Sequence, residues 1–186
     1  FYSDDYDLHS ENAFSEFMIY NKSEGSGIYS NIVDFIKAAV DLPRKGRVLD
    51  IGCGKGLLLH RFALLFPEWE LFGIEPSRNA QKYFRRVIPQ VKLFNGSLEE
   101  SMFAKEKFDL VLANGVLEHV PFPANFLEIY RSCISNGVGY IGVPNFENNP
   151  SDLFTYDHLS RFTPRTIEGL FATTGFSVLS KMAPGS

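Results

Sequence analysis

The sequence predicts a single α/β domain built on a doubly wound, mainly parallel sheet. From residue 48 onward, short apolar runs typical of buried strands alternate with segments whose apolar residues recur at helical spacing. The chain has 186 residues, of which 45% are hydrophobic, enough for one buried core without a disulfide or metal to hold it together. Right-handed crossovers between parallel strands would place helices on both faces of the sheet.

The elements are expected in a regular order. Residues 1–26 are polar, acidic and aromatic without a clear period, which predicts an irregular arm or lid ahead of a domain at 27–186. Strands are expected at the apolar runs 48–51, 69–74, 91–94, 108–113, 138–143 and 176–182. Helices are expected where apolar residues share one helical face, at 28–39, 57–66, 77–87, 126–133 and 163–175.

Capping residues mark several of the helix boundaries. Pro67 ends the second helix, and Ser77 suits the N-cap of the third because its hydroxyl can accept a bond from a free backbone N–H. Thr163 and Pro164 suit the N-cap and first position of the last helix, which Gly175 ends. These residues mark where the second helix ends, where the third begins, and where the last begins and ends.

Charge and cysteine content narrow the class of protein. With 18 basic and 22 acidic residues the net charge is −4, so the basic surface of a nucleic-acid-binding protein is not expected. The chain lacks a long uninterrupted apolar stretch and a basic, then apolar N-terminus, so we expect neither a membrane span nor a signal peptide. Cys53 and Cys133 lie far apart, which favours a reducing, cytoplasmic location, and without a His/Cys cluster in the sequence no metal site is expected.

Glycines and acids follow the first two predicted strands. The run Asp50–Gly56 (DIGCGKG) follows the first, and its glycines permit a sharp turn and close approach of a ligand. Glu75 follows the second strand about 20 residues after Gly54, where a carboxylate can accept both hydroxyls of a ribose. The pair predicts a nucleoside-containing cofactor. Leu57 stands where a dinucleotide fingerprint has its third glycine, and Asp50 would repel a pyrophosphate, so a cationic ligand is favoured.

Together these strand ends resemble the motifs of class I S-adenosylmethionine-dependent methyltransferases. The matching stretches are, in chain order, 48–56 (VLDIGCGKG), 73–77 (GIEPS), 95–98 (NGSL), 108–111 (FDLV) with 114–120 (NGVLEHV), and 142–145 (GVPN). The resemblance covers residues 20 to 180. It implies a Rossmann-like fold and S-adenosylmethionine as the cofactor.

By this resemblance the cofactor lies across the carboxyl ends of the strands. Gly52 and Gly54 would face its methionine portion, with Cys53 between them in the same loop. Asp50 would favour the amino group, directly or through water, and Glu75 would bind the ribose hydroxyls.

The same resemblance assigns the adenine and methyl ends of the cofactor. Pro76 would lie against the adenine, and Ser97 and Leu98 would border its edge. Many relatives carry Asp where Ser97 stands, so the contact with the adenine amino group would be weaker or come from the backbone. Asn114 would lie beside the transferable methyl group.

The long connection 144–162 follows the fifth predicted strand and should overhang the acceptor pocket. His158 within it is the candidate general base, and Thr155–Ser160 resembles a segment of sugar methyltransferases that contributes such a base. The alternative for His158 is a solvated loop side chain, and His119 is the second candidate base, expected instead to be structural or to support a neighbouring residue. This predicts methyl transfer to a small-molecule acceptor, with a sugar or glycan precursor as the candidate.

Two other functions remain open. A non-catalytic regulatory or partner module would keep the glycine loop and Glu75 but lack an acceptor pocket. A dinucleotide oxidoreductase is disfavoured by Leu57 and Asp50. The sequence ends soon after its sixth predicted strand, where relatives have a seventh, so we expect a C-terminally shortened domain or an edge covered by another segment.

Overall fold

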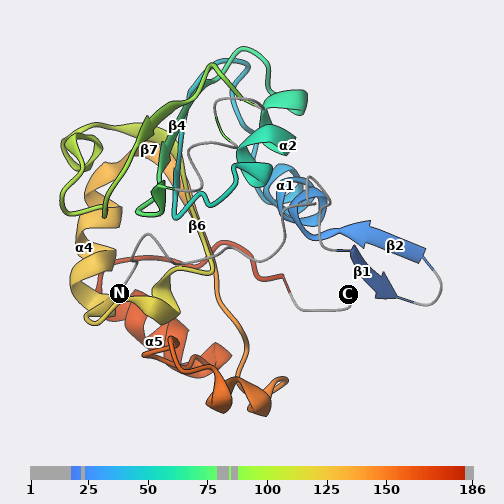
Figure 1. Cartoon of the computed structure of the whole chain (residues 1–186), viewed down its shortest axis with the longest axis vertical. Coiled ribbons are helices and arrows are strands. Elements are labelled where there is room, and N and C mark those ends of the chain that lie inside the picture. The colour runs from blue at the N-terminus through green and yellow to red at the C-terminus, as the bar shows by residue number, and fades with distance from the viewer. Residues whose placement is uncertain (1–17, 22–23, 79–83, 85–87, 183–186) are drawn as a thin grey trace.

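The computed structural model describes residues 18–21, 24–78, 84 and 88–182. Its centre is a five-stranded parallel sheet with the strand order β5-β4-β3-β6-β7 (Figure 1). The strands are β3 (Arg47–Ile51), β4 (Glu70–Ile74), β5 (Lys92–Phe94), β6 (Phe108–Asn114) and β7 (Ile134–Gly142). The chain proceeds outward from β3 to β5 and then returns to the other side of β3 for β6 and β7. The predicted doubly wound fold is confirmed, and its switch point lies between β3 and β6, where such sheets bind ligands.

Helices cover both faces of the sheet (Figure 1). Helices α1 (Ile28–Ala39) and α2 (Leu57–Leu65) pack on one face, and α4 (Pro123–Cys133) and α5 (Pro164–Thr173) on the other. Short 3₁₀ turns lie at η1 (Met102–Lys105), η2 (Leu117–His119) and η3 (Pro150–Phe154). Both η2 and η3 come after the carboxyl ends of strands.

Strand β6 shows why the sheet carries two apolar cores. Leu110 and Leu112 are fully buried among side chains of α1 and α2, whereas Val111 and Ala113 are fully buried on the α4 side. Successive side chains of a strand point to opposite faces, so a strand covered on both sides must be apolar throughout. That explains the continuous apolar run in the sequence.

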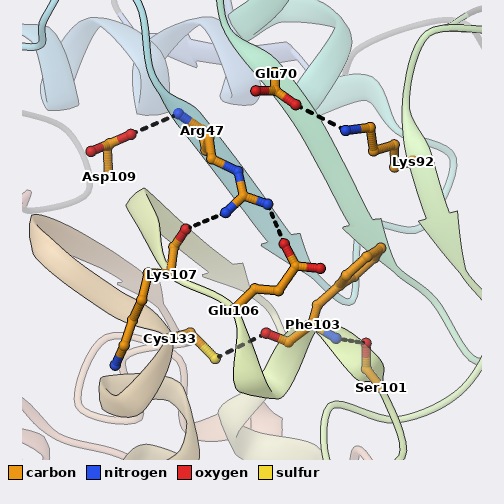
Figure 2. Close-up of polar contacts among 9 residues, drawn as sticks. All are labelled: Arg47, Glu70, Lys92, Ser101, Phe103, Glu106, Lys107, Asp109 and Cys133. Atoms are coloured by element: carbon orange, nitrogen blue, oxygen red, sulfur yellow. Dashed lines mark hydrogen bonds and ion pairs between the residues drawn. The ribbon is translucent and has the colours of Figure 1, made fainter.

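The amino ends of the strands carry a paired set of charges (Figure 2). The backbone N–H of Arg47 donates to Oδ2 of Asp109 at 2.8 Å, and its guanidinium donates to the Lys107 carbonyl at 2.7 Å and to Glu106. Lys92 pairs with Glu70 across β5 and β4 at 2.9 Å. These contacts fasten β3 to the start of β6 at the end of the sheet opposite the glycine loop.

The structure differs from two expectations about the ends of the chain, and residues 1–17 of the predicted arm lie outside the described part. Part of the predicted irregular arm is a hairpin of β1 (Met18–Asn21) and β2 (Glu24–Gly27), which leads into α1. The predicted strand at 176–182 does not form. Gly175 adopts a φ of 80° and the Phe176 N–H donates back to the Phe171 carbonyl at 2.9 Å, which closes α5. A strand needs a hydrogen-bonded neighbour, and among the described residues none pairs with 176–182.

Other boundaries shifted or lie outside the described part. Strand β7 begins at Ile134 rather than 138, because Ile134 already pairs with Phe108 of β6. Within the predicted helix 77–87 only Arg78 and Phe84 are described as helical, and 79–83 and 85–87 lie outside the described residues. No helix in the described part of the chain combines the length and apolar character needed to cross a bilayer.

Candidate cofactor and acceptor site

The glycine loop turns sharply after β3, and its first two glycines are needed for different reasons. Gly52 and Gly54 have φ angles of 68° and 51°, in the left-handed region that disfavours residues with a side chain. A Cβ on Gly52 would lie 2.5 Å from Cγ2 of Val116, so the loop packs directly on the segment after β6. Among the residues that the structure describes, a Cβ on Gly54 would meet nothing within 4 Å. Gly54 therefore borders open space, as a cofactor-facing glycine should.

The loop is fixed to the end of β4. The backbone N–H groups of Gly52 and Cys53 both donate to the Ile74 carbonyl, at 2.8 and 3.1 Å. Cys53 is buried, and its sulfur occupies the space that a side chain on Gly73 would need. Burial raises the pKa of the Cys53 thiol well above its usual range, so the thiol stays protonated. Cys53 therefore contributes packing and backbone position to the predicted site.

Glu75 connects the end of β4 to the glycine loop. One carboxylate oxygen accepts the Gly54 N–H and the other accepts the Ser77 N–H, each at 2.8 Å. Burial raises the pKa of Glu75, and the two backbone N–H bonds partly oppose this by favouring the charged form. Each carboxylate oxygen has two lone pairs, so both can still accept a ribose hydroxyl. Gly54 and Glu75, which are far apart in the sequence, are thus in direct contact.

A second acid, Asp50, lies buried near Glu75. Its side chain is 2% exposed, and burial, with a contribution from the Glu75 charge, raises the pKa of Asp50 well above its usual range. Among the residues that the structure describes, no Lys or Arg forms an ion pair with Asp50 or Glu75. Burial without a cationic partner disfavours the charged forms of both acids in the empty protein, and a positively charged ligand between them would favour those charged forms.

The predicted adenine-side residues lie after β5. Asn95 donates to the carbonyls of Glu75 and Pro76, both at 2.9 Å, and so holds the Pro76 turn against the end of β5. The Ser97 N–H donates to Glu100 at 3.1 Å, and Leu98 packs into the core on the α4 side. Their contacts with adenine remain predictions. The bracing role of Asn95 was missed in the sequence, although Asn directly after a strand is a signal for such a turn.

Asn114 ends β6 at the switch point of the sheet. Tyr140 on β7 donates to its Oδ1 at 3.5 Å, and Gly142 leaves the space in which that oxygen lies. The Gly115 N–H also donates to the Gly142 carbonyl at 2.9 Å. The ends of β6 and β7 therefore fix Asn114 at the edge of the sheet where the resemblance places the transferable methyl group.

His158 belongs to a cluster with Glu118 and His119 of η2. One ligand atom from each of the three residues lies within 4.8 Å of the others, and the two imidazole centroids are 4.7 Å apart. The Ser160 N–H donates to the Glu118 carbonyl at 3.0 Å, which holds the His158 segment on η2. From the sequence a site was predicted at His158, but His119 was expected to be structural and Glu118 was given no role. The signal was present, because Glu118 and His119 follow a strand end.

Each member of this cluster has a distinct environment. His119 Nδ1 lies 3.0 Å from the Asp157 carbonyl, and His158 Nδ1 lies 2.7 Å from Oδ1 of the buried Asp152, an ion-pair distance without hydrogen-bond geometry. Glu118 is 3% exposed, and its Oε2 has no hydrogen-bond partner. Burial raises the pKa of Glu118, which the nearby His119 partly opposes.

The segment that carries His158 is held in place by Arg161. The guanidinium donates to the carbonyls of His158, Thr155, Leu153 and Asp152, at 2.8, 3.1, 3.2 and 3.3 Å. Phe154 and Tyr156 in the same segment are 86% and 83% exposed. A fixed loop therefore presents apolar rings to solvent beside the histidine pair.

The fold is that of a doubly wound α/β protein, and its strand-end residues predict a nucleoside-containing ligand at the switch point. Comparison with known families identifies the class. Residues 26–181 match the family model described as "Methyltransferase domain". The chain belongs to this family, within the class I S-adenosylmethionine-dependent methyltransferases.

Curated relatives support the same class. The chain is 35% identical over 109 residues to the ubiquinone biosynthesis O-methyltransferase of Azorhizobium caulinodans, covering 55% of this chain and 42% of the relative. It is 30% identical over 115 residues to the trans-aconitate 2-methyltransferase of Methylobacterium nodulans, covering 61% and 44%. The match thus spans less than half the length of these relatives.

A solved structure supports the fold. The plantazolicin methyltransferase BpumL, in complex with a monoazolic desmethylPZN analog and SAH, superposes with a TM-score of 0.68 at 20% identity. The superposition covers 85% of this chain and 70% of that one.

Proposed function

We propose that this chain binds S-adenosylmethionine and transfers its methyl group to an oxygen atom of a small-molecule acceptor. The observation that carries the proposal is the pair of buried acids, Asp50 and Glu75, which lie beside an open glycine loop without a cationic partner among the described residues. When bound, S-adenosylmethionine supplies a methyl group on a cationic sulfonium, from which a nucleophile can displace it. A buried negative site suits a ligand that carries both a sulfonium and an ammonium group.

The chain's own residues divide the binding. Glu75 is placed to accept the ribose hydroxyls, while the Gly54 N–H keeps the loop against the carboxylate. Asp50 favours the ligand's amino group, directly or through water, and Gly52 and Cys53 hold the loop on Ile74. Pro76, Ser97 and Leu98 border the adenine, and Asn114 borders the methyl group. Positioning of the two reactants supplies most of the rate enhancement, up to about 7–11 kcal/mol.

His158 is proposed to be required for removal of the acceptor's proton. It lies in the segment after β7, packed on η2, and the Asp152 carboxylate at its Nδ1 leaves Nε2 as the nitrogen available to a substrate. Proton transfer by a positioned group contributes roughly 10²–10⁴-fold to such reactions. We expect His158→Ala to lower turnover by that order while S-adenosylmethionine affinity stays within twofold.

The names of the relatives and the exposed rings of the loop suggest which acceptors to test first. The two curated relatives are named for ubiquinone biosynthesis and for trans-aconitate, and neither name includes a sugar. The resemblance of Thr155–Ser160 to sugar methyltransferases keeps a sugar or glycan precursor as one acceptor to test. The exposed rings of Phe154 and Tyr156 favour an acceptor with an apolar or ring-shaped surface.

Calorimetric titration of the chain with S-adenosylmethionine, S-adenosylhomocysteine and NADH tests the cofactor. Binding of the first two and not of NADH would support the proposal, and binding of NADH alone would overturn it. A screen for methyl transfer to phenols, carboxylic acids and nucleotide sugars would then test the reaction. Tight cofactor binding without transfer to any class would instead favour a non-catalytic binding module.

A further inference from the structure

We propose that Glu118, His119 and His158 bind a divalent first-row transition-metal ion of the Zn²⁺ type. The ion's place in catalysis depends on the proposed methyl transfer, but its binding does not. The proposal departs from the metal-free site expected from the sequence. Its ligand set, two imidazoles and one carboxylate, is the set that open catalytic sites for such ions use.

The two histidines are oriented as metal ligands. A carbonyl oxygen can only accept a hydrogen bond, so the contact of His119 Nδ1 with the Asp157 carbonyl at 3.0 Å places the proton on Nδ1. The Asp152 carboxylate, 2.7 Å from His158 Nδ1, favours a proton on that nitrogen too. Both neutral rings then carry a free lone pair on Nε2. Metal-binding histidines are typically held in this way, with the second nitrogen facing a carbonyl or carboxylate.

The third ligand supplies an independent observation. Glu118 is only 3% exposed, yet its Oε2 has neither a hydrogen bond nor access to solvent. Leaving a buried charged oxygen without a partner costs several kcal/mol in general, so such an atom indicates a missing partner. In this cluster one carboxylate oxygen of Glu118 lies within 4.8 Å of a ring nitrogen of His119 and of a ring nitrogen of His158. A cation between the three groups would satisfy that oxygen.

The surrounding charges also favour a cation. Asp152 and Asp157 add two carboxylates beside the histidines, and Oδ2 of Asp157 lies 3.6 Å from His119 Nδ1. The nearest positive group on this segment, Arg161, directs its guanidinium N–H groups to four backbone carbonyls of the loop. It therefore fixes the loop without occupying the space between Glu118 and the two rings.

The geometry needs only a small adjustment. Two ligand atoms about 2.0–2.1 Å from one tetrahedral Zn²⁺ ion lie about 3.3 Å apart. The three ligand atoms here lie within 4.8 Å of one another, so side-chain rotations that bring them closer would close the site. Because three protein ligands leave a coordination position open, an acceptor oxygen can bind there.

The location gives the ion a role in the proposed reaction. A Cβ on Gly115 would lie 3.7 Å from Oε1 of Glu118, and Gly115 directly follows Asn114 at the predicted methyl position. A bound divalent cation lowers the pKa of an oxygen that coordinates it. The acceptor O–H would release its proton to solvent. The oxygen would then form the new C–O bond as the C–S bond breaks and its electron pair stays on sulfur. In this step His158 would hold the ion that activates the acceptor instead of taking the proton itself, and His158→Ala would lower turnover in both cases.

Metal binding can be measured directly. The full chain, freed of metal by a chelator, is titrated with Zn²⁺ in competition with a chromophoric chelator, and Mg²⁺ is titrated separately. We expect one Zn²⁺ per chain with a dissociation constant below 10 μM, and at least 100-fold weaker Mg²⁺ binding. Absence of a stoichiometric Zn²⁺ site would overturn the proposal.

Variants assign the site. Glu118→Gln keeps the shape of the side chain but removes its charge, and we expect it and His119→Gln each to weaken Zn²⁺ binding at least tenfold. Glu128→Gln, on the exposed face of α4, and His60→Gln on α2 are the matched controls and should bind as the original chain does. Unchanged Zn²⁺ affinity in both cluster variants would contradict the assignment. Circular dichroism confirms folding, and His158→Asn replaces any variant that fails it.

A second titration separates this proposal from the proposed function. S-adenosylmethionine affinity is measured with chelator present and again with one equivalent of Zn²⁺. Cofactor binding without a Zn²⁺ site would leave the methyltransferase assignment intact and overturn the metal site. Zn²⁺ binding without cofactor binding would leave the metal site intact and overturn the proposed methyltransferase function.

Discussion

The two ends of the central sheet differ in whether their charged side chains form ion pairs. At the amino ends, Arg47 pairs with Glu106 and Lys92 pairs with Glu70 near solvent, and the Asp109 carboxylate accepts the backbone N–H of Arg47 (Figure 2). At the carboxyl ends, Asp50, Glu75 and Glu118 are buried, and no Lys or Arg among the described residues forms an ion pair with any of them.

This difference in charge pairing suggests that one end of the sheet contributes to stability and the other to ligand binding. Paired surface charges fasten strands together at little cost. Buried acids without cations cost free energy in the empty protein, and they are retained in proteins where a ligand repays that cost. Charge pairing at one end and unpaired acids at the other therefore indicate which end binds the cationic ligand. The following predictions test this contrast, from the largest expected effect to the smallest.

Two glycines of one loop should respond differently to the same substitution. Gly52→Ala places a methyl group 2.5 Å from Val116 in left-handed backbone, and we expect it to lower the free energy of unfolding by about 3 kcal/mol. Gly54→Ala meets open space, so it should lower that free energy by only about 1 kcal/mol but weaken S-adenosylmethionine binding more than tenfold. Urea unfolding and calorimetry measure the two effects. Equal stability losses in both variants would contradict the packing difference.

Glu70 begins strand β4 and Glu75 directly follows its last residue, which gives a matched pair. Glu75→Ala should weaken S-adenosylmethionine binding at least tenfold, because it removes the ribose acceptor and two bonds that hold the Gly54 and Ser77 N–H groups. Glu70→Ala at the amino end removes an exposed ion pair with Lys92 and should leave that affinity unchanged. Titration of both variants provides the comparison. Unchanged affinity in the Glu75 variant would exclude its ribose role.

The pH dependence of stability should report the buried charge of Asp50. Its pKa is raised by burial, so the folded state holds a proton that the unfolded state releases near pH 4. The free energy of unfolding of the ligand-free chain should therefore fall as pH rises from about 4 to the folded-state pKa, by about 1.4 kcal/mol for each pH unit in that interval. Asp50→Asn lacks this loss, so its stability should change less between pH 5 and pH 8. Urea unfolding measures both proteins at both pH values. An equal change in the free energy of unfolding between pH 5 and pH 8 in the original chain and in Asp50→Asn would contradict the prediction.

The smallest effect is expected at the paired end. Asp109→Asn weakens the acceptor of the Arg47 N–H, and we expect a loss of about 0.5–1 kcal/mol in the free energy of unfolding with unchanged S-adenosylmethionine affinity. Thermal unfolding and calorimetry check the two parts. A fall in cofactor affinity would show that the two ends of the sheet are coupled.

The regular part of the fold was predictable from residue patterns. The continuous apolar run of β6, buried on both faces, could only fit the middle of a covered sheet, and the glycine run after β3 marked its turn. The spacing of Gly54 and Glu75 predicted that both lie at the carboxyl ends of strands, and the structure adds the direct bond between them. These features are local, or depend on parallel strands ending at a common edge.

The features that were missed depend on long-range neighbours. Residues Phe176 to Met182 have strand-like composition, but strand formation requires a pairing partner that local composition does not reveal. Similarly, Glu118 and His119 meet His158 only because the segment after β7 folds back on η2, which the Ser160 contact records. Distant residues in sequence thus formed a cluster that the residue spacing did not indicate.

The segment 145–162 is closed at its base by a parallel bridge between Asn145 and Phe162 and by the Phe146 N–H bond to the Phe162 carbonyl at 2.9 Å. These two contacts hold the ends of the loop together through backbone atoms, so they do not depend on the side chains between them. Insertions and exchanges inside the loop can then accumulate without disturbing β7 or α5, since lengthening a closed loop costs little. The proposed acceptor side can therefore change during evolution while the proposed cofactor side of the sheet stays constant.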